Sequence, residues 1–377
     1  MSKILIVCNY DFTFNKYMIP LANKLMERGY KVGVLCDGDQ IDYERVAGGV
    51  IDFHFISIPK EISFSGFFSA IREMRGIIKE NHYEIVNSNN RNSSFIARVV
   101  LMTMPFSNVK NVYTARGMYF HDSQRLIPGL ITYWLEVFLL FFTDLLMSQS
   151  KEDVDRMIKN PLVNTSKLRV IHNGINTDRF SVKRIKPLNI KLSGTVICTV
   201  GRIAKEKGLM DLLEAFSKFL PHEPNATLLL IGGVLHKEQD SVLSAIMQYA
   251  DQLNIKDNIY ITGLVENVED YLSLADVYVH PSYREGVPRS VLEAMSLEKI
   301  VIASKIRGSN EIIDHGESGI LYAKGDVKEL SEKMAEVFHM THDQKTTMVK
   351  KARERVLDNY TETSYVDRQF GFIDSLK

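Results

Sequence analysis

The chain has 377 residues, of which 45% are apolar and 24% charged, and its formal net charge is zero. This length predicts two domains of about 150 residues or slightly more, and the composition is that of an ordinary globular protein. Three widely spaced cysteines, Cys8, Cys36 and Cys198, argue against a disulfide framework or a zinc site and fit a reducing cytoplasm. The N-terminus enters a strand almost at once, which argues against a signal peptide.

The two halves of the chain differ in charge. Residues 1–188 hold 24 Lys and Arg against 18 Asp and Glu, and residues 189–377 hold 22 against 28. The first half therefore carries +6 and the second half −6. A positive surplus can serve an anionic membrane surface or an anionic substrate, although chance explains a difference of this size equally well.

Strand and helix patterns alternate along the first half. Residues 3–8 are a continuous apolar run typical of a strand buried on both faces, and a polar loop over 9–15 follows. Helical spacing over 17–28 stops at Gly29, so the opening predicts a βαβ unit of a doubly wound sheet. The further predicted elements are strand 31–36, helix 65–80, strand 85–86, helix 93–103, strand 109–114, helix 126–142 and strand 144–148.

Two stretches of this half have the character of membrane-contacting segments. Residues 62–79 are amphipathic, and residues 126–147 are strongly apolar. Spanning a bilayer takes roughly 20 apolar residues, whereas Glu136 and Asp144 interrupt the second stretch. A helix that packs on the sheet is the favoured interpretation, and docking on a membrane surface stays open.

The alternation restarts after a junction at residues 160–190, which holds a short strand, a turn-rich loop and a basic segment. The elements predicted beyond it are strand 195–200, helix 209–220, strand 226–231, helix 238–253, strand 259–262, helix 268–274, strands 275–280 and 300–304, loop 307–311, turn 314–319 and terminal helices. We therefore predict the α/β class, with two Rossmann-like doubly wound domains that face each other across a cleft.

Two acids flank a predicted helix start in residues 281–295. Glu285 follows the strand at 275–280, so it lies at the carboxyl end of a parallel strand, where open α/β sheets keep their ligands. Glu293 falls in the first turns of the helix, and the amides around Ser290 and Val291 suit an anion such as phosphate. An ordinary loop acid and an ordinary helix-surface acid would show the same pattern.

The loop 201–208 leaves another strand and opens on the same predicted sheet edge. It is neither the dinucleotide fingerprint nor a P-loop. Arg202 could grip a diphosphate through its planar fork and Lys207 as a point charge, although two solvated cations fit the loop alone equally well. A carboxylate commonly holds ribose hydroxyls, so Glu293 could reach a ribose and Glu285 the group on the other side of the diphosphate.

Gly201-Arg-x4-Lys-Gly208, followed by Glu285-x7-Glu293, resembles the retaining nucleotide-sugar glycosyltransferases of the GT-B class, family four, also called group 1. Residues 173–180 look like the interdomain segment of that family, and residues 310–319 like its following loop. These motifs occur in order over nearly the whole chain. Residues 112–120 and 283–293 look closest to bacterial members that extend lipid-linked glycans for surface polysaccharides such as O antigen or capsule.

The resemblance implies a metal-independent hexosyltransferase without cofactor that retains the anomeric configuration. The implied donor is a UDP-sugar carrying an N-acetylhexosamine or a hexose, and the implied acceptor is a lipid-diphosphate-linked glycan. We expect a cytoplasmic protein, peripheral on the inner face of the cell membrane, with an anionic membrane surface and no nucleic acid among its partners. Residues 1–180 would bind the acceptor and residues 181–362 the nucleotide-sugar, and the helix at 363–377 would pack back on the first domain.

The resemblance also implies roles for individual residues. Lys207 and Arg202 would hold the donor diphosphate, Glu285 the donor sugar and Glu293 the ribose. The predicted donor-binding residues are Gly201, Arg202, Lys207, Glu285, Gly286, Ser290, Val291 and Glu293. The predicted catalytic residues are Glu285, Arg202, Lys207 and Arg116.

The first domain departs from the family pattern in two places. The loop at 9–15 is not glycine-rich, and Arg116-Gly117 stands where many members carry His-Gly. Arg116 could face the diphosphate or the acceptor, and His121 could replace the missing histidine, but a structural role fits both at least as well. The predicted acceptor-side residues are Asn89, Asn90, Arg91 and His121.

Two other functions stay open at this point. A nucleotide-sugar 2-epimerase shares the two-domain form, and a non-catalytic nucleotide-sugar-binding module would bind the same ligand without turnover. The intact acids and cations of both motifs weigh against the binding module. A nicotinamide dehydrogenase is disfavoured because no G-x-G-x-x-G follows the first strand of either domain.

Overall fold

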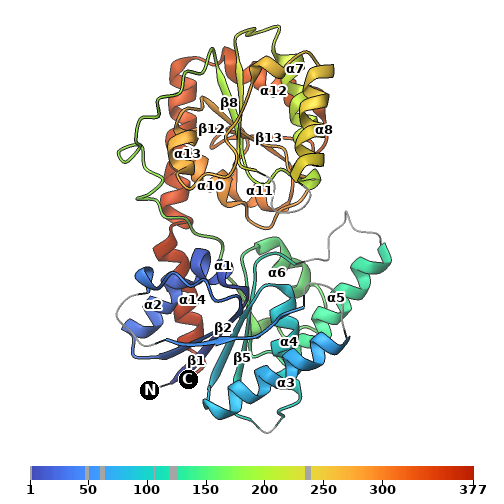
Figure 1. Cartoon of the computed structure of the whole chain (residues 1–377), viewed down its shortest axis with the longest axis vertical. Coiled ribbons are helices and arrows are strands. Elements are labelled where there is room, and N and C mark those ends of the chain that lie inside the picture. The colour runs from blue at the N-terminus through green and yellow to red at the C-terminus, as the bar shows by residue number, and fades with distance from the viewer. Residues whose placement is uncertain (1, 47–50, 60–63, 106, 119–125, 234–238) are drawn as a thin grey trace. The chain divides into compact units, whose positions relative to one another are not determined.

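The computed structural model describes residues 2–46, 51–59, 64–105, 107–118, 126–233 and 239–377 (Figure 1). The chain forms two compact units, Met1–His172 with Thr363–Lys377, and Asn173–Glu362. The division falls after His172 and not at residue 180, because the residues that follow pack with the second unit. Ile175 and Phe180 are buried in its core, and the Asn173 side chain donates to the backbone oxygen of Val287 at 2.9 Å.

The first unit is built on a parallel sheet of order β3-β2-β1-β4-β5-β6-β7. Its strands are β1 Lys3–Tyr10, β2 Lys31–Asp37, β3 Asp52–Phe55, β4 Ile85–Asn89, β5 Lys110–Ala115, β6 Leu145–Ser148 and β7 Leu168–Val170. Its helices are α1 Asp11–Thr13, α2 Ile19–Glu27, α3 Phe64–Glu80, α4 Arg91–Met102, α5 Leu126–Leu140, α6 Lys151–Ile158 and, at the end of the chain, α14 Glu362–Asp374. The strand order reverses between β1 and β4, the kind of position at which such sheets bind ligands.

Strand β1 shows why this sheet is covered on both faces. Successive side chains of a strand point to opposite faces, and in β1 both sets are apolar. Ile4 and Ile6 belong to a buried cluster with α2 and α14 residues, whereas Leu5 and Val7 belong to a second cluster with residues of α3 and α4. Helix α14 is fixed on this unit also by Tyr30, whose hydroxyl donates to an Asp374 carboxylate oxygen at 2.7 Å.

The second unit is built on a parallel sheet of order β10-β9-β8-β11-β12-β13. Its strands are β8 Val196–Val200, β9 Thr227–Ile231, β10 Ile259–Ile261, β11 Val277–His280, β12 Ile300–Ser304 and β13 Ile320–Tyr322. Its helices are α7 Leu209–Phe219, α8 Gln239–Gln252, α9 Val268–Ser273, α10 Arg289–Ser296, α11 Arg307–Ile312, α12 Val327–His339 and α13 His342–Asn359. Ile197 faces a core shared with α7 and α12, and Cys198 faces a core shared with α10 and α13.

The predicted α/β class with two doubly wound sheets is confirmed. Several local predictions are wrong. The polar loop at 9–15 is in fact the end of β1, helix α1 and the start of a π-helix, Phe14–Met18, and the loop at 307–311 is helix α11. Periodicity does not reveal β3, β13 and α6, because runs of three to eight residues are too short to show a period.

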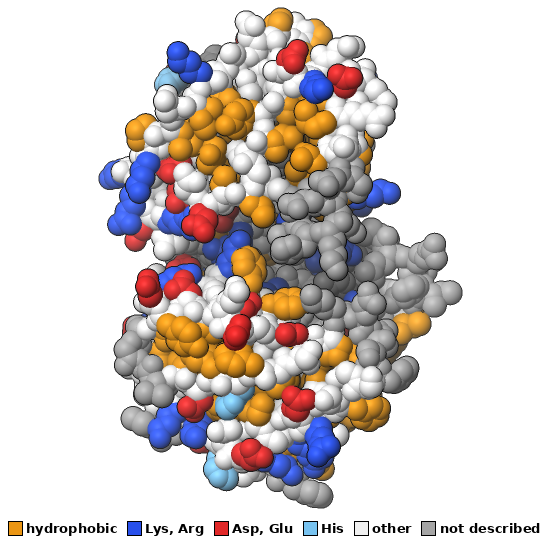
Figure 2. Space-filling model, viewed as in Figure 1, with side chains coloured by type: hydrophobic (Ala, Val, Ile, Leu, Met, Phe, Trp, Pro, Cys, Tyr) orange, Lys and Arg blue, Asp and Glu red, His pale blue; other side chains and the backbone are white. Residues whose placement is uncertain are grey.

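In the view of Figure 2, side chains of both charge signs are interspersed with apolar side chains on each unit. Among the described residues, the helices are each too short or too polar to cross a bilayer.

Candidate functional site

A pocket lies at the carboxyl ends of β8, β9 and β11 in the second unit. The loop after β8 contributes Gly201, Arg202 and Lys207 to its wall, and the end of β11 contributes His280 and Ser282. This is the sheet edge at which the sequence predicts the donor-binding loops. The position follows from parallel strands, whose carboxyl ends share one edge.

Lys207 and Glu285 meet beside this pocket. The ammonium of Lys207 donates a hydrogen bond to Glu285 Oε1, and Ser282 Oγ donates to the same oxygen at 3.3 Å. The Lys207 and Glu285 side chains are 22% and 19% exposed, so water screens this ion pair less than one on the open surface. The backbone oxygen of Glu285 accepts from Arg307 Nη2 at 3.1 Å, which fixes the loop from its other side.

Gly208 lets the two loops approach each other. Its φ is +66°, in the left-handed region that glycine adopts without strain. A Cβ at this position would lie 2.1 Å from the backbone oxygen of Pro281. Tyr283 N also donates to the Glu206 oxygen at 3.0 Å, so the Lys207 turn and the loop after β11 are held together by backbone contacts.

The charge state of this cluster follows from burial and from Lys207. Burial lowers the pKa of His280 to about 4, against the opposing effect of Glu285, so the ring is neutral at pH 7. Burial favours the protonated form of Glu285, but His280, Lys207 and Ser282 together hold the pKa of its carboxyl below the usual value. Because His280 is neutral at pH 7, the positive charge that keeps Glu285 ionised there is that of Lys207.

His280 is a site residue that the sequence analysis missed. Its ring is 2% exposed, and its Nε2 lies 3.7 Å from Glu285 Oε1 without a hydrogen-bond partner among the described residues. Tyr278 OH lies 3.2 Å from His280 Nδ1 and donates to Ser290 Oγ at 2.8 Å. Tyr278 therefore holds the ring at its Nδ1 side, and Nε2 is the ring nitrogen nearer Glu285. The sequence signal that could have indicated this site residue is a histidine at the end of an otherwise apolar strand.

The other charged residues predicted to bind the donor make longer side-chain contacts than Lys207 and Glu285 do. Arg202 lines the pocket, but its side chain is 56% exposed and its Nη2 lies 3.4 Å from Glu206 Oε1. Glu293 lies one turn along α10 from Arg289, with Oε1 at 3.9 Å from Arg289 Nε. Ser290 and Val291 occupy the first turn of α10, where amides have no acceptor within the helix. The Val291 side chain is fully buried, so only its backbone can face a ligand.

Gly286 lies in close backbone contact with Gly308. A Cβ on Gly308, in α11, would lie 1.7 Å from the Gly286 backbone oxygen. Helix α11 therefore seats directly on the loop that carries Glu285.

The predicted acceptor-side residues gather at the carboxyl edge of the first unit's sheet. Asn89 ends β4, Asn90 precedes α4 with φ +70°, and Arg91 begins α4. Arg116 follows the neighbouring strand β5, and its guanidinium stacks on the Tyr17 ring, 4.5 Å from the centroid. His121, the remaining predicted acceptor residue, lies outside the described residues.

Several polar atoms at this edge are buried and unsatisfied. Among the described residues, Asn89 Oδ1, Asn90 Oδ1 and Arg116 Nε have no hydrogen-bond partner. Buried polar groups are normally paired, and each exception needs an explanation. A polar ligand at the ends of β4 and β5 would supply the missing partners.

Solved structures share this architecture over the whole chain. A glycosyltransferase from Rickettsia africae ESF-5 superposes with a TM-score of 0.82 at 18% identity, covering 100% of this chain and 98% of that one. Anabaena Alr3699/HepE in complex with UDP and glucose superposes with a TM-score of 0.80 at 16% identity, covering 100% of both chains. The fold is the GT-B fold of glycosyltransferases.

Two family models place the chain more closely. The model for glycosyl transferases group 1 matches residues 182–355, and the model for glycosyltransferase family 4 matches residues 15–179. Together the two matches span most of the chain, and the protein belongs to this family of glycosyltransferases.

The curated relatives match along most of their length. The putative glycosyltransferase EpsD of Bacillus subtilis is 26% identical over 90% of this chain and 88% of its own. The UDP-Gal:alpha-D-GlcNAc-diphosphoundecaprenol alpha-1,3-galactosyltransferase of Escherichia coli is 23% identical over 90% of this chain and 87% of its own. The capsular polysaccharide biosynthesis glycosyltransferase CapM of Staphylococcus aureus is 26% identical over 82% and 81%.

Proposed function

We propose that the protein transfers an N-acetylhexosamine or a hexose from a UDP-sugar to a lipid-diphosphate-linked glycan, with retention of anomeric configuration, in bacterial surface polysaccharide synthesis. The observation that carries the proposal is the Lys207–Glu285 pair beside a pocket at the carboxyl edge of the second sheet. The activity that names the Escherichia coli relative and the UDP in the HepE complex support the choice of donor and acceptor. A role in polysaccharide synthesis is supported by CapM, a capsular polysaccharide biosynthesis glycosyltransferase.

On the donor side, the reaction needs positive charge where the diphosphate leaves. Lys207 supplies a fixed charge, Arg202 supplies a planar fork, and the first-turn amides of α10 supply further donors. Such stabilisation of developing charge is often the largest contribution to catalysis. Ionised Glu285 accepts hydrogen bonds from donor-sugar hydroxyls, and Glu293 accepts from the ribose.

On the acceptor side, the proposal uses the first unit. Asn89, Asn90 and Arg91 would bind the acceptor glycan, and Arg116 would face its diphosphate or that of the donor. The unsatisfied atoms of Asn89, Asn90 and Arg116 support this assignment. The departing phosphate takes the proton of the acceptor hydroxyl on the face from which it leaves, so the proposed reaction uses neither a metal nor a cofactor. We place it at the inner face of the cell membrane, where a lipid-linked acceptor would present its sugar.

The proposal is tested by a UDP-release assay across a panel of UDP-sugars, with lipid-diphosphate-GlcNAc and -GalNAc as acceptors and with EDTA in a parallel series. Release must depend on the acceptor and persist in EDTA. Lys207→Ala and Glu285→Ala should abolish release, whereas Lys205→Ala, which removes an exposed cation from the same turn, should not. Full activity of both site variants would overturn the site.

Two further outcomes would replace the proposed function. Inversion of a sugar carbon in a UDP-sugar incubated without acceptor, seen by NMR, would identify an epimerase. Calorimetric binding of UDP-sugars without turnover on any acceptor would identify a binding module.

A further inference from the structure

Helix α5 of the first unit exposes an unbroken apolar stripe. Its exposed side chains recur at the three- and four-residue spacing of one helix face, and the stripe continues into the two residues after the helix. The stripe consists of Ile131, Trp134, Leu135, Phe138, Phe141 and Phe142, which are between 39% and 64% exposed. Contiguous apolar surface of this kind marks a site of protein or membrane contact. Helix α5 projects at the margin of its unit in Figure 1.

The opposite side of α5 already has its partners. Val137 and Leu140 are buried with Val154 and Met157 of α6. The single charge on the helix, Glu136, also faces inward, where Arg98 Nη1 and Nη2 donate to its two carboxylate oxygens at 2.6 and 3.2 Å. The helix therefore has two apolar faces, one packed in the core and one exposed. The exposed face is the stripe, and it carries no charge.

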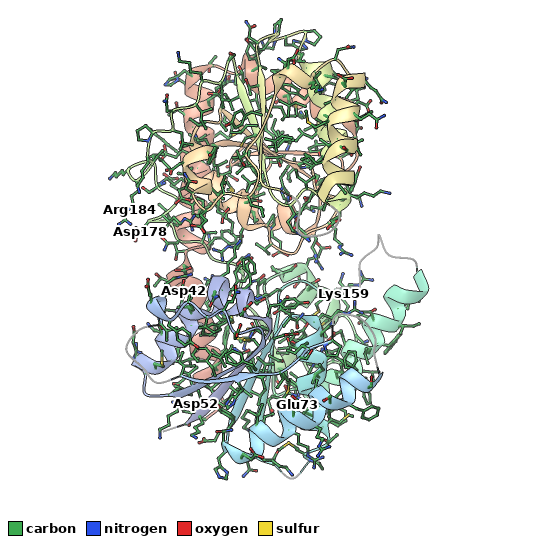
Figure 3. The ribbon with its side chains drawn as sticks, viewed as in Figure 1. Asp42, Asp52, Glu73, Lys159, Asp178 and Arg184 are labelled. Atoms are coloured by element: carbon green, nitrogen blue, oxygen red, sulfur yellow. The ribbon has the colours of Figure 1, made fainter. Side chains whose placement is uncertain are left out.

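Cations lie beside the stripe. Lys167 Nζ donates to the backbone oxygens of Leu140 and Phe141, at 3.3 and 3.4 Å, and so sits at the C-terminal end of α5. Helix α6, which packs on the buried side of α5, exposes Arg156 and Glu152 and is followed by exposed Lys159, labelled in Figure 3. An aromatic face with Trp and Phe flanked by Lys and Arg is the pattern of a helix that lies in a bilayer interface.

We propose that the α5 stripe docks this protein on the surface of an anionic phospholipid bilayer. The biological role of this docking rests on the proposed function, since a lipid-linked acceptor must be reached at a membrane. The structural observations that support the docking surface are independent of that function. A second copy of the chain is the competing occupant, because exposed Asp144 and Glu152 could face Lys167 of a partner across a two-fold contact, and the dimer measurement below decides between the two. Anionic headgroups would pair with the cations beside the stripe while Trp134 and the phenylalanines enter the acyl boundary.

Trp134 provides a direct probe, because it is the only tryptophan of the chain. Vesicles of phosphatidylcholine and phosphatidylglycerol should shift its emission to the blue, and brominated lipids should quench it. Vesicles of phosphatidylcholine alone should bind more weakly. Unchanged Trp134 emission at saturating anionic vesicles would overturn the proposal.

A matched pair of variants tests the stripe itself. Ile131→Ser/Phe138→Ser/Phe141→Ser keeps the probe and should partition onto vesicles at least about tenfold more weakly, since a factor of ten is only about 1.4 kcal/mol. Phe68→Ser removes a side chain that is 72% exposed on α3 of the same unit and should bind like the wild type. Equal binding of the triple variant would overturn the proposal, as would a blue shift that needs only high protein concentration and accompanies dimer formation in sedimentation.

Transfer assays separate this inference from the proposed function. With an acceptor whose lipid is short and water-soluble, the triple variant should match the wild type. Vesicle binding without any sugar transfer by the wild type would remove the proposed function and leave the docking surface standing. Sugar transfer without vesicle binding would remove the docking surface and leave the proposed function standing.

Discussion

Lys207 donates a hydrogen bond to Glu285 across 78 residues of sequence, and this contact joins the loop after β8 to the loop after β11. The loops are set at this distance by backbone contacts, namely the hydrogen bond from Tyr283 N to the Glu206 oxygen and the approach of Gly208 to Pro281. The pair therefore belongs to the framework of the pocket before a substrate enters it. Positive charge held in advance is what a leaving diphosphate requires.

Loss of the Lys207 ammonium should lower kcat/KM by at least the factor of about 10²–10³ found when one preorganised donor is removed from a reaction centre, which leaves no release above the background of the assay. Steady-state UDP release measures the effect, with Lys205→Ala as the matched control. Activity of Lys207→Ala within a factor of three of the control would show that the ammonium is a structural cation only.

Gly208 and Gly263 give a second matched comparison, because they share a left-handed backbone, with φ of +66° and +69°. Alanine at either position would lower the free energy of unfolding by about 1–2 kcal/mol, the cost of a left-handed backbone for a residue with a Cβ. Only at Gly208 would the new Cβ meet a backbone atom, the Pro281 oxygen, whereas nothing lies within 4 Å at Gly263. Gly208→Ala should therefore lower the free energy of unfolding further than Gly263→Ala and also reduce transfer activity. Chemical denaturation and UDP release of the two variants check this, and equal losses would contradict the close approach.

His280 predicts a dependence of stability on pH. Burial lowers its pKa to about 4 from an ordinary value of 6.5, while Glu285 acts to raise it and Lys207 to lower it. Between these values the unfolded chain binds the proton and the folded chain does not, so stability is complete above pH 6.5 and falls as the pH decreases toward 4. The loss between pH 6.5 and pH 5 should be about 2 kcal/mol.

Unfolding curves of wild type and His280→Gln at pH 7, 6 and 5 measure this contribution. The variant should show a flatter dependence over this window, whatever its stability at pH 7. Parallel curves for the two proteins would assign the dependence to other groups.

The buried pair Arg98–Glu136 should behave as a unit. Glu136→Ala leaves a guanidinium that is 1% exposed without its carboxylate and should cost about 3–5 kcal/mol of stability. Arg98→Met/Glu136→Leu removes both charges and should recover most of that loss. A double variant as unstable as Glu136→Ala would show that shape, and not the unpaired charge, determines the loss.

The sequence predicted those features that depend on local pattern and on the geometry of parallel sheets. Apolar runs and helical spacing located most strands and helices, and the shared carboxyl edge placed Arg202, Lys207 and Glu285 together. The short helix α6 was missed, although Ser150 caps it by accepting from Asp153 N at 3.3 Å, a spacing that the sequence shows.

Features that depend on tertiary contact could not be read from the sequence. The helix at 126–142 was predicted to pack on the sheet, and it does, but an all-apolar pattern cannot tell which side is left exposed. The buried side of the helix includes Glu136, whose carboxylate pairs with Arg98, 38 residues earlier in the chain. In the same way, His280 acquires its position only through Tyr278 and Ser290.

The central claim is a donor site at Lys207 and Glu285 that transfers sugar with retention. Proton NMR of the glycan formed from a UDP-α-sugar and a lipid-diphosphate-linked acceptor tests it most directly. An α-linked product that forms with the wild type and Lys205→Ala, but not with Lys207→Ala or Glu285→Ala, is the predicted result. A β-linked product, or an α-linked product formed equally well by all four proteins, would contradict it.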